Sequence, residues 1–178
     1  MTRIVRLEGL GNCHEGSRVQ PKARIDAMRL HLVTVGSPKL EYARVGCELY
    51  ATRLTRFHKL RVTRVRDSKR QGAAAMLEEG VAMLEAVGSA YLIALDPRGK
   101  LLDTPTLSAT LEKLGVDGHG ELAFVIGGDE GLSDAVRSRA NLLWSLSALT
   151  FPHDLAQLVT LEALYRASTV AAGVPYHK

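Results

Sequence analysis

The sequence predicts an α/β fold in which a mostly parallel sheet is flanked by helices. Short apolar runs of strand length alternate with longer runs whose apolar residues recur at helical spacing. This alternation is typical of βαβ units, which place their strands parallel. The chain has 178 residues, 46% of them hydrophobic, which suits one domain with a continuous core.

The alternation begins at Met28. The run Met28–Gly36 alternates and then becomes apolar, which predicts a buried strand that ends at a Gly-Ser-Pro turn. Three elements should follow: a helix over Glu41–Phe57, a short strand over Leu60–Val65 and a helix over Ala73–Val87.

The second half continues the pattern. A strand over Tyr91–Leu95 should end at Asp96-Pro97, and a helix should begin at Thr104 with Pro105 just inside its start. The remaining predicted elements are a strand over Leu122–Ile126, a short helix over Leu132–Arg139, a strand over Leu142–Leu146 and a long helix over Pro152–Ala171.

The first residues differ from the rest. Met1–Ala27 carries glycines and scattered charges without a sustained period, so we expect an extension outside the core and a single domain over residues 28–178. An apolar signal segment is missing, no apolar run is long enough to span a bilayer, and Cys13 and Cys47 lack metal-ligand spacing. We therefore expect a cytoplasmic protein that uses neither membrane nor metal.

Charge is unevenly distributed. Residues 28–88 are basic and residues 89–178 are acidic, within a total of +4. The basic side chains Arg61, Arg64, Arg66, Lys69 and Arg70 lie close together in sequence, as expected of a surface that contacts a nucleic-acid backbone. The alternative is that these cations only solvate exposed faces.

The glycine-rich segment Gly127–Gly131 lies between a predicted strand and a predicted helix. In parallel sheets, ligands bind where strands end, and glycines let a backbone approach a ligand closely. The segment lacks the Lys-Ser/Thr of a phosphate loop, and its acids Asp129 and Glu130 favour a cationic or hydroxyl-bearing ligand. The alternative is a tight turn with an exposed acid pair.

Two further segments carry groups suited to binding. In Trp144–His153, small and hydroxyl residues alternate with apolar ones, which can form a wall for an adenine; the alternative is an ordinary buried connection. The tail, Gly173–Lys178, ends in Tyr176, His177 and Lys178, although most tails are frayed.

A resemblance rests on these motifs. The chain contains, in order, Leu95-Asp-Pro-Arg-Gly-Lys100, Val125-Ile-Gly-Gly-Asp-Glu-Gly-Leu132, Leu146-Ser-Ala-Leu-Thr-Phe-Pro-His153, Leu164-Tyr-Arg-Ala167 and Tyr176-His177. From Met28 to Lys178 it resembles the pseudouridine N3-methyltransferases of the large ribosomal subunit, the RlmH family of the SPOUT class. The resemblance implies a trefoil knot near the C-terminus, a rare exception to the rule that chains do not thread.

The resemblance also implies a function. Members of the family are homodimers that use S-adenosylmethionine to methylate N3 of a pseudouridine in helix 69 of 23S rRNA, on assembled ribosomes. The cofactor-binding residues that it implies are Leu95, Gly127, Leu146, Ser147, Ala148, Leu149, Thr150 and Phe151.

The catalytic residues are less closely defined. The proton of pseudouridine N3 needs an acceptor, for which the candidates are His177, His153 and Glu130; we rank His177 first because a tail can close after RNA docks. Arg166 and Tyr176 are suited to holding phosphate or base. Gln157 stands where relatives usually carry Arg, which puts an RNA contact there in doubt.

Two other functions remain open at this point. The chain could be a non-catalytic ribosome-binding or assembly factor that retains the pocket, or a knotted methyltransferase that acts on tRNA. Apolar residues on more than one face of Pro152–Ala171 favour packing against both the sheet and a partner subunit.

Overall fold

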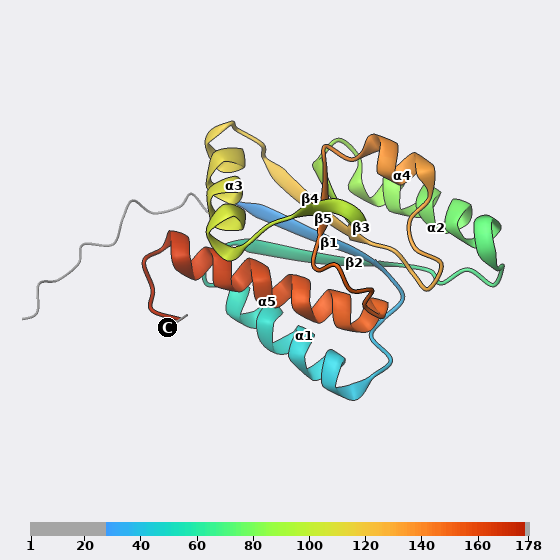
Figure 1. Cartoon of the computed structure of the whole chain (residues 1–178), viewed down its shortest axis with the longest axis horizontal. Helices are drawn as coiled ribbons and strands as arrows, with labels where there is room; N and C mark the ends of the chain where they lie inside the picture. Colours follow the sequence, from blue (N-terminus) through green and yellow to red (C-terminus); the bar gives the residue numbers. More distant parts are fainter. Residues whose placement is uncertain (1–27, 177–178) are drawn as a thin grey trace, which may run out of the picture.

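The computed structural model describes residues 28–176, and every structural statement below concerns that range. Its strands form one sheet in the order β2-β1-β4-β3-β5, and every neighbouring pair is parallel (Figure 1). The strands are β1 (Arg29–Val35), β2 (Lys59–Val65), β3 (Tyr91–Leu101), β4 (Glu121–Ile126) and β5 (Leu142–Ser145). The predicted parallel α/β fold is therefore confirmed.

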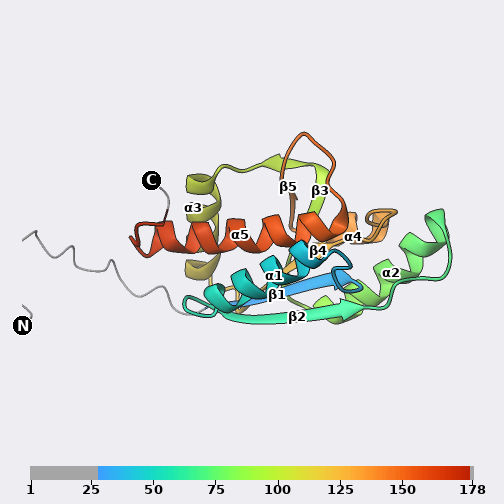
Figure 2. The ribbon, with the colours of Figure 1, turned by 90° about the horizontal axis from the view of Figure 1, so that it is seen from below.

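Helices cover both faces of the sheet (Figures 1 and 2). They are α1 (Glu41–Leu54), α2 (Gly72–Val87), α3 (Thr104–Val116), α4 (Asp134–Arg139) and α5 (His153–Ala171). One face carries α1, α3 and α5, and the other carries α2 and α4. The predicted order of elements is confirmed within a few residues at most boundaries.

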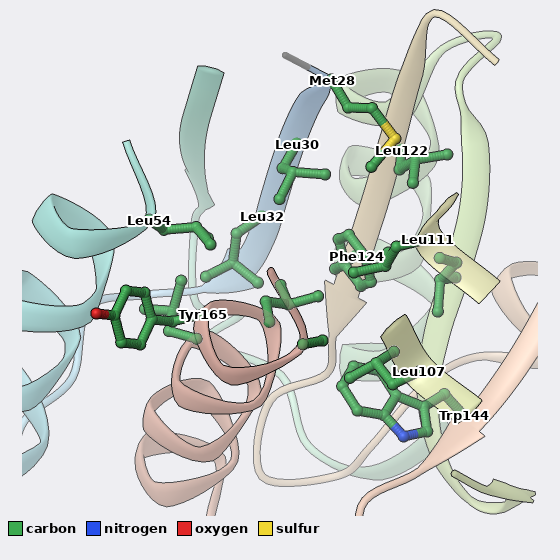
Figure 3. Packing of buried hydrophobic residues seen from close by; sticks show 14 of the residues in the cluster. Met28, Leu30, Leu32, Leu54, Leu107, Leu111, Leu122, Phe124, Trp144 and Tyr165 are labelled. Atoms are coloured by element: carbon green, nitrogen blue, oxygen red, sulfur yellow. The ribbon is translucent and has the colours of Figure 1, made fainter. Parts of the chain in front are cut away.

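The core divides between the two faces because side chains alternate along a strand. Leu30 and Leu32 of β1 join the cluster beneath α1, α3 and α5, whereas Val33 and Val35 join the cluster beneath α2 and α4. Figure 3 shows the first cluster, in which Phe124 of β4 packs with residues of α3 and α5. Complete burial of such a side chain contributes about 1.5–3 kcal/mol.

Strand β3 differs from the prediction, which ended it at Asp96-Pro97. It continues to Leu101, with a register shift in which Leu95 and Lys100 both pair with Trp144 of β5. The residues between these pairs do not take part in the ladder. Pro97, which has no N–H, is therefore tolerated there without the loss of a hydrogen bond between strands. Gly99 then passes so close to β5 that a Cβ there would lie 2.5 Å from the carbonyl carbon of Leu143.

Helix starts follow local chemistry. Asp103 Oδ1 accepts the N–H of Thr106 at 2.8 Å and so caps α3. Helix α4 begins at Asp134 rather than at the predicted Leu132, because Gly131 has a φ of +85° and Leu132 is buried in the core. Ser133 caps α4 instead, through the N–H of Val136.

The two ends of the chain and the knot are not described by the structure. The expectations for Met1–Ala27 and for His177 concern residues outside the described range, and the trefoil knot stays a prediction. Within residues 28–176, no helix combines the length and apolar character needed to cross a membrane.

Candidate functional site

A cavity of about 300 Å³ lies where β4 and β5 end and where the register of β3 shifts, at the edge of the sheet that the sequence indicated. Its lining comes from four segments: residues 95–97, residues 126–132, residues 144–151 without Ala148, and the first residues of α5. Of the predicted cofactor-binding residues, Leu95, Gly127, Leu146, Ser147, Leu149, Thr150 and Phe151 line the cavity, whereas Ala148 does not.

The glycine-rich turn after β4 forms one wall. A Cβ on Gly127 would lie 2.6 Å from the carbonyl carbon of Gly131, which leaves no space for any side chain there. Gly131 has a φ of +85°, in the left-handed region that glycine tolerates best. The turn therefore folds back tightly on itself and exposes backbone to the cavity.

The segment between β5 and α5 forms the facing wall. Ser145 Oγ donates a hydrogen bond to the carbonyl of Ser147 at 2.8 Å, and Ser147 Oγ accepts the N–H of Leu149 at 3.0 Å. These local bonds fix the backbone, while Leu146 and Phe151 give the wall apolar surface. The combination suits a flat aromatic ring with polar edges.

His153 connects the two walls. Its Nδ1 lies 2.8 Å from Asp129 Oδ1, and its Nε2 lies 2.9 Å from Asp154 Oδ1. Asp154 is buried, and its other oxygen accepts the N–H groups of Lys39 and Leu40 at 2.7 and 2.8 Å. One chain of polar contacts thus joins the loops that follow β1, β4 and β5.

Glu130 lines the cavity, and its carboxylate also holds a neighbouring helix. Its Oε1 accepts the N–H of Gly72 at 3.0 Å, at the first residue of α2. An anionic acceptor at a helix N-terminus is favourable because it satisfies an orphan donor and faces the positive end of the helix dipole. Asp154 makes a similar contact with Lys39 and Leu40, the two residues just before α1.

Asp96 is a third acid of the cavity. Arg98 donates to both of its oxygens at 2.9 and 3.0 Å, and Arg137 lies 3.8 Å away. The hydrogen bonds from Arg98 hold the pKa of this buried carboxyl below its usual value. Asp96 is therefore an anion that fixes β3 beside α4 at the point where its register shifts.

Arg166 and Tyr176 lie together but away from the cavity. The Tyr176 hydroxyl lies 3.2 Å from that of Tyr50, and the Arg166 guanidinium lies 5.1 Å from the Tyr176 ring centre and pairs with Glu162. The hydrogen bond with Tyr50 contributes most to raising the pKa of Tyr176 to about 12. The structure thus separates these two predicted site residues from His153 and Glu130 within one chain.

Gln157 is only 3% exposed, and its amide nitrogen has no partner among the described residues. The side chain therefore lies inside the fold rather than on its surface, and the question of an RNA contact at this position stays open.

Sequence reasoning missed three residues of the site: Asp96, Trp144 and Asp154. Asp96 and Trp144 stood inside the quoted motifs, but nothing in their spacing gave them a role. Asp154 is an acid in the first turn of a helix, which ordinarily signals only a favourable charge. Among residues 28–176, no three His, Cys, Asp or Glu side chains are grouped to hold a metal ion.

Comparison with known families gives a match over the whole described range. A family model described as "Predicted SPOUT methyltransferase" matches residues 28–177. The chain is 55% identical over 151 residues to a Deinococcus deserti protein named ribosomal RNA large subunit methyltransferase H, covering 85% of this chain and 100% of that protein. It is 38% identical over 159 residues to a Clostridium acetobutylicum protein of the same name, again over 85% and 100%.

Solved structures share the fold at low identity. A probable methyltransferase from Bordetella pertussis superposes with a TM-score of 0.50 at 14% identity, over 81% of this chain and 98% of that chain. A probable methylase family protein from Haemophilus influenzae also gives 0.50, at 15% identity, over 86% and 71%. At this identity the likeness concerns the arrangement of the backbone alone.

Proposed function

The chain belongs to the SPOUT methyltransferase family, and we propose that it transfers a methyl group from S-adenosylmethionine to N3 of a pseudouridine in helix 69 of 23S rRNA, on assembled ribosomes in the cytoplasm. One observation carries the proposal: Leu95, Gly127 and the Leu146–Phe151 segment, which are far apart in sequence, line one cavity. Relatives at 55% and 54% identity are named ribosomal RNA large subunit methyltransferase H, which supports rRNA as the substrate.

The chemistry of the cavity fits the proposed cofactor. Apolar side chains of Leu95, Leu146 and Phe151 would hold the adenine, and backbone groups of the glycine turn would meet the ribose or the amino acid part. The acids Asp129 and Glu130 suit a ligand that carries hydroxyls and positive charge. When bound, the sulfonium cofactor supplies an electrophilic methyl group and needs no metal.

The chain must align the target base and accept one proton. Pseudouridine N3 becomes nucleophilic when its proton is lost to a base, and the new N–C bond forms as the methyl–sulfur bond breaks. Alignment can supply several kcal/mol, and a base typically adds about 10²–10⁴-fold. His153 and Glu130 are already engaged with neighbouring groups, which supports ranking His177 of the tail first.

We further propose a homodimer. The outer face of α1 exposes the apolar side chains of Tyr42, Val45 and Leu49, which are 45–55% exposed, and Leu40 precedes them at 46%. Helix α5, which the sequence suggested for this contact, is largely covered by α1 and α3. An apolar patch of this kind is typical of a surface that another subunit covers.

Dimerisation also accounts for the separation of the proposed site residues. Arg166 and Tyr176 lie on the α1–α5 side of one chain but not at its own cavity. A partner bound to the α1 face could present these residues, and the tail that follows them, to the cavity. Two inactive variants, one altered at Gly127 and one lacking the tail, should then restore activity when they are mixed as dimers.

The proposal is tested in cells by mapping modified nucleotides in a strain that lacks the gene. Loss of one methyl group from a helix 69 pseudouridine, restored by the gene, supports it. Loss of a tRNA methyl group would identify a tRNA enzyme, and unchanged RNA with defective ribosome assembly would identify an assembly factor. Calorimetry with S-adenosylmethionine distinguishes an assembly factor from an enzyme, since an enzyme should bind the cofactor at micromolar concentration.

A further inference from the structure

The basic residues between Arg61 and Arg70 occupy three different places in the fold. Arg61 pairs with Glu121 at 3.2 Å and donates to His31 Nδ1 at 2.9 Å, at the amino ends of the strands and away from the cavity. Arg64 lies on the α1 side of the sheet, the face to which Leu60, four residues earlier along β2, also points. Only Arg66, Lys69 and Arg70 remain on the segment that joins β2 to α2.

Carboxylates fix the backbone of this segment. Glu79, which is buried, accepts the N–H of Ser68 at 3.0 Å, and Glu78 accepts the Ser68 hydroxyl at 2.7 Å. At the far end Glu130 accepts the N–H of Gly72. Because the acids bind backbone and hydroxyl donors, they fix the segment without neutralising all of its cations.

The cations of the segment face solvent. Arg66, Lys69 and Arg70 are exposed, and within residues 28–176 neither Arg66 nor Lys69 takes part in an ion pair. Arg70 lies 3.7 Å from Glu78, but both side chains are more than half exposed. Such a pair contributes only about 0–1 kcal/mol, so a phosphate can replace Glu78. A fixed backbone lowers the entropy lost when these side chains bind an anion.

The segment adjoins the cavity. A small cleft is lined by Lys39 and Asp67 together with Gly128, Asp129 and His153, and the last three also line the main cavity. Glu79 reaches the same turn, since a Cβ on Gly128 would lie 3.1 Å from its Oε2. The segment therefore reaches the turn that lines the proposed cofactor site through Asp67 and through Gly72 at its end, while its three cations point to solvent on the same segment.

We propose that Arg66, Lys69 and Arg70 form a preorganised site for RNA backbone phosphates next to the target nucleotide. The partner is RNA because the surface offers exposed cations, which contact phosphates without reading sequence, on a segment that reaches the cavity proposed to act on RNA through Asp67 and Gly72. This inference rests on the proposed function for the identity of the RNA. It identifies the three cations that would bind the phosphates, and it leaves Arg61 and Arg64 outside the phosphate site.

The test compares two variants, each of which lacks three positive charges. R66Q/K69Q/R70Q removes the proposed site, and R56Q/K59Q/K113Q removes three exposed cations elsewhere as the control. The readouts are the KM for large ribosomal subunits across a salt series, kcat, and the Kd of S-adenosylmethionine. Co-sedimentation with the subunits measures binding without catalysis.

The first variant should raise KM about tenfold at 0.15 M salt, and its log–log salt slope should fall by about 2, since each phosphate contact contributes roughly 0.7–0.9. Its cofactor Kd and kcat should stay unchanged, and the control should match wild type. A KM, salt slope and subunit binding equal to wild type would overturn the proposal.

Failure of the proposed function gives a result that differs from failure of the phosphate site. If the wild type transferred no methyl group but bound subunits through the three cations, the phosphate site would stand and the enzyme assignment would fall. A photo-crosslinking residue in place of Lys69 identifies the partner directly. A crosslink to rRNA supports the site, and a crosslink only to a ribosomal protein contradicts it.

Discussion

The Nδ1 atom of His153 lies 2.8 Å from Oδ1 of Asp129, so that the start of α5 is joined to the glycine-rich turn across the rim of the cavity. The second ring nitrogen meets Asp154, and the ring is mostly buried. Nδ1 is hydrogen-bonded to Asp129, whereas Nε2 lies 2.9 Å from the buried Oδ1 of Asp154 without forming a hydrogen bond. The geometry suits a residue that positions the two walls better than one that takes the proton from pseudouridine.

His153→Ala should weaken S-adenosylmethionine binding, because the glycine turn loses its link to α5. We expect a rise in Kd on the order of tenfold, about 1.4 kcal/mol, with kcat at saturation within a few-fold of wild type. Calorimetry and steady-state kinetics measure both. A kcat loss near 10²–10⁴-fold with unchanged Kd would instead identify His153 as the proton acceptor.

Glu130→Gln should retain most activity, because the amide oxygen can still accept the N–H of Gly72. Glu130→Ala removes the acceptor and should destabilise the protein by about 0.5–2 kcal/mol, as loss of a helix cap does. Thermal unfolding and kcat distinguish the two effects. If the Gln variant folds normally and is inactive, Glu130 accepts the proton.

Gly127→Ala should abolish cofactor binding, since its Cβ would lie 2.6 Å from a backbone carbon of Gly131. Relief of the clash requires the turn to leave the position in which it lines the cavity. Gly120→Ala is the matched control, because its Cβ would meet only the mobile end of Arg29 at 3.1 Å. Equal cofactor affinity in both variants would show that the turn is not part of the binding site.

The sequence was sufficient to predict most of the fold and the location of the site. Apolar periodicity located the strands and helices from Met28 to Ala171, and glycines and strand ends located the cavity. It could not predict the continuation of β3, because Pro97 and Gly99 normally stop a strand and the register shift depends on the neighbour β5.

Tertiary contacts explain what was missed in the site. The links from Asp154 to α1 and from Glu130 to α2 join residues far apart in sequence, so no local pattern reveals them. Arg61 and Arg64 looked like one cluster, although an odd spacing along a strand places two side chains on opposite faces.

Leu49→Asp should convert the proposed dimer into monomers, since it puts a charge in the middle of the exposed apolar face of α1. Sedimentation velocity measures the change, and activity should fall with it if the tail serves the partner's cavity. Leu77→Asp on α2 is the control, as Leu77 is 60% exposed on the other face of the sheet. A Leu49→Asp protein that stays dimeric would place the interface elsewhere.

Acid should destabilise the fold through His58. Burial lowers the pKa of this histidine from 6.5 to about 4, and its Nε2 lies 2.9 Å from Ser168 Oγ. Between those pH values the unfolded chain binds a proton that the folded chain does not, so stability falls as pH drops from 6.5 towards 4. The loss attributable to His58 is at most about 3 kcal/mol.

Urea unfolding of wild type and His58→Gln across this pH range isolates that contribution. The variant should show a shallower decline, with the remaining slope due in part to His31, whose pKa burial also lowers. Parallel declines would show that His58 does not control acid stability.

Mass-spectrometric mapping of 23S rRNA tests the central claim most directly. Purified protein is incubated with isotopically labelled S-adenosylmethionine and with ribosomes from cells lacking the gene. We predict one labelled methyl group on N3 of a pseudouridine in helix 69, absent with Gly127→Ala and present with Gly120→Ala. A label on another nucleotide, on tRNA or on no RNA at all would contradict the account.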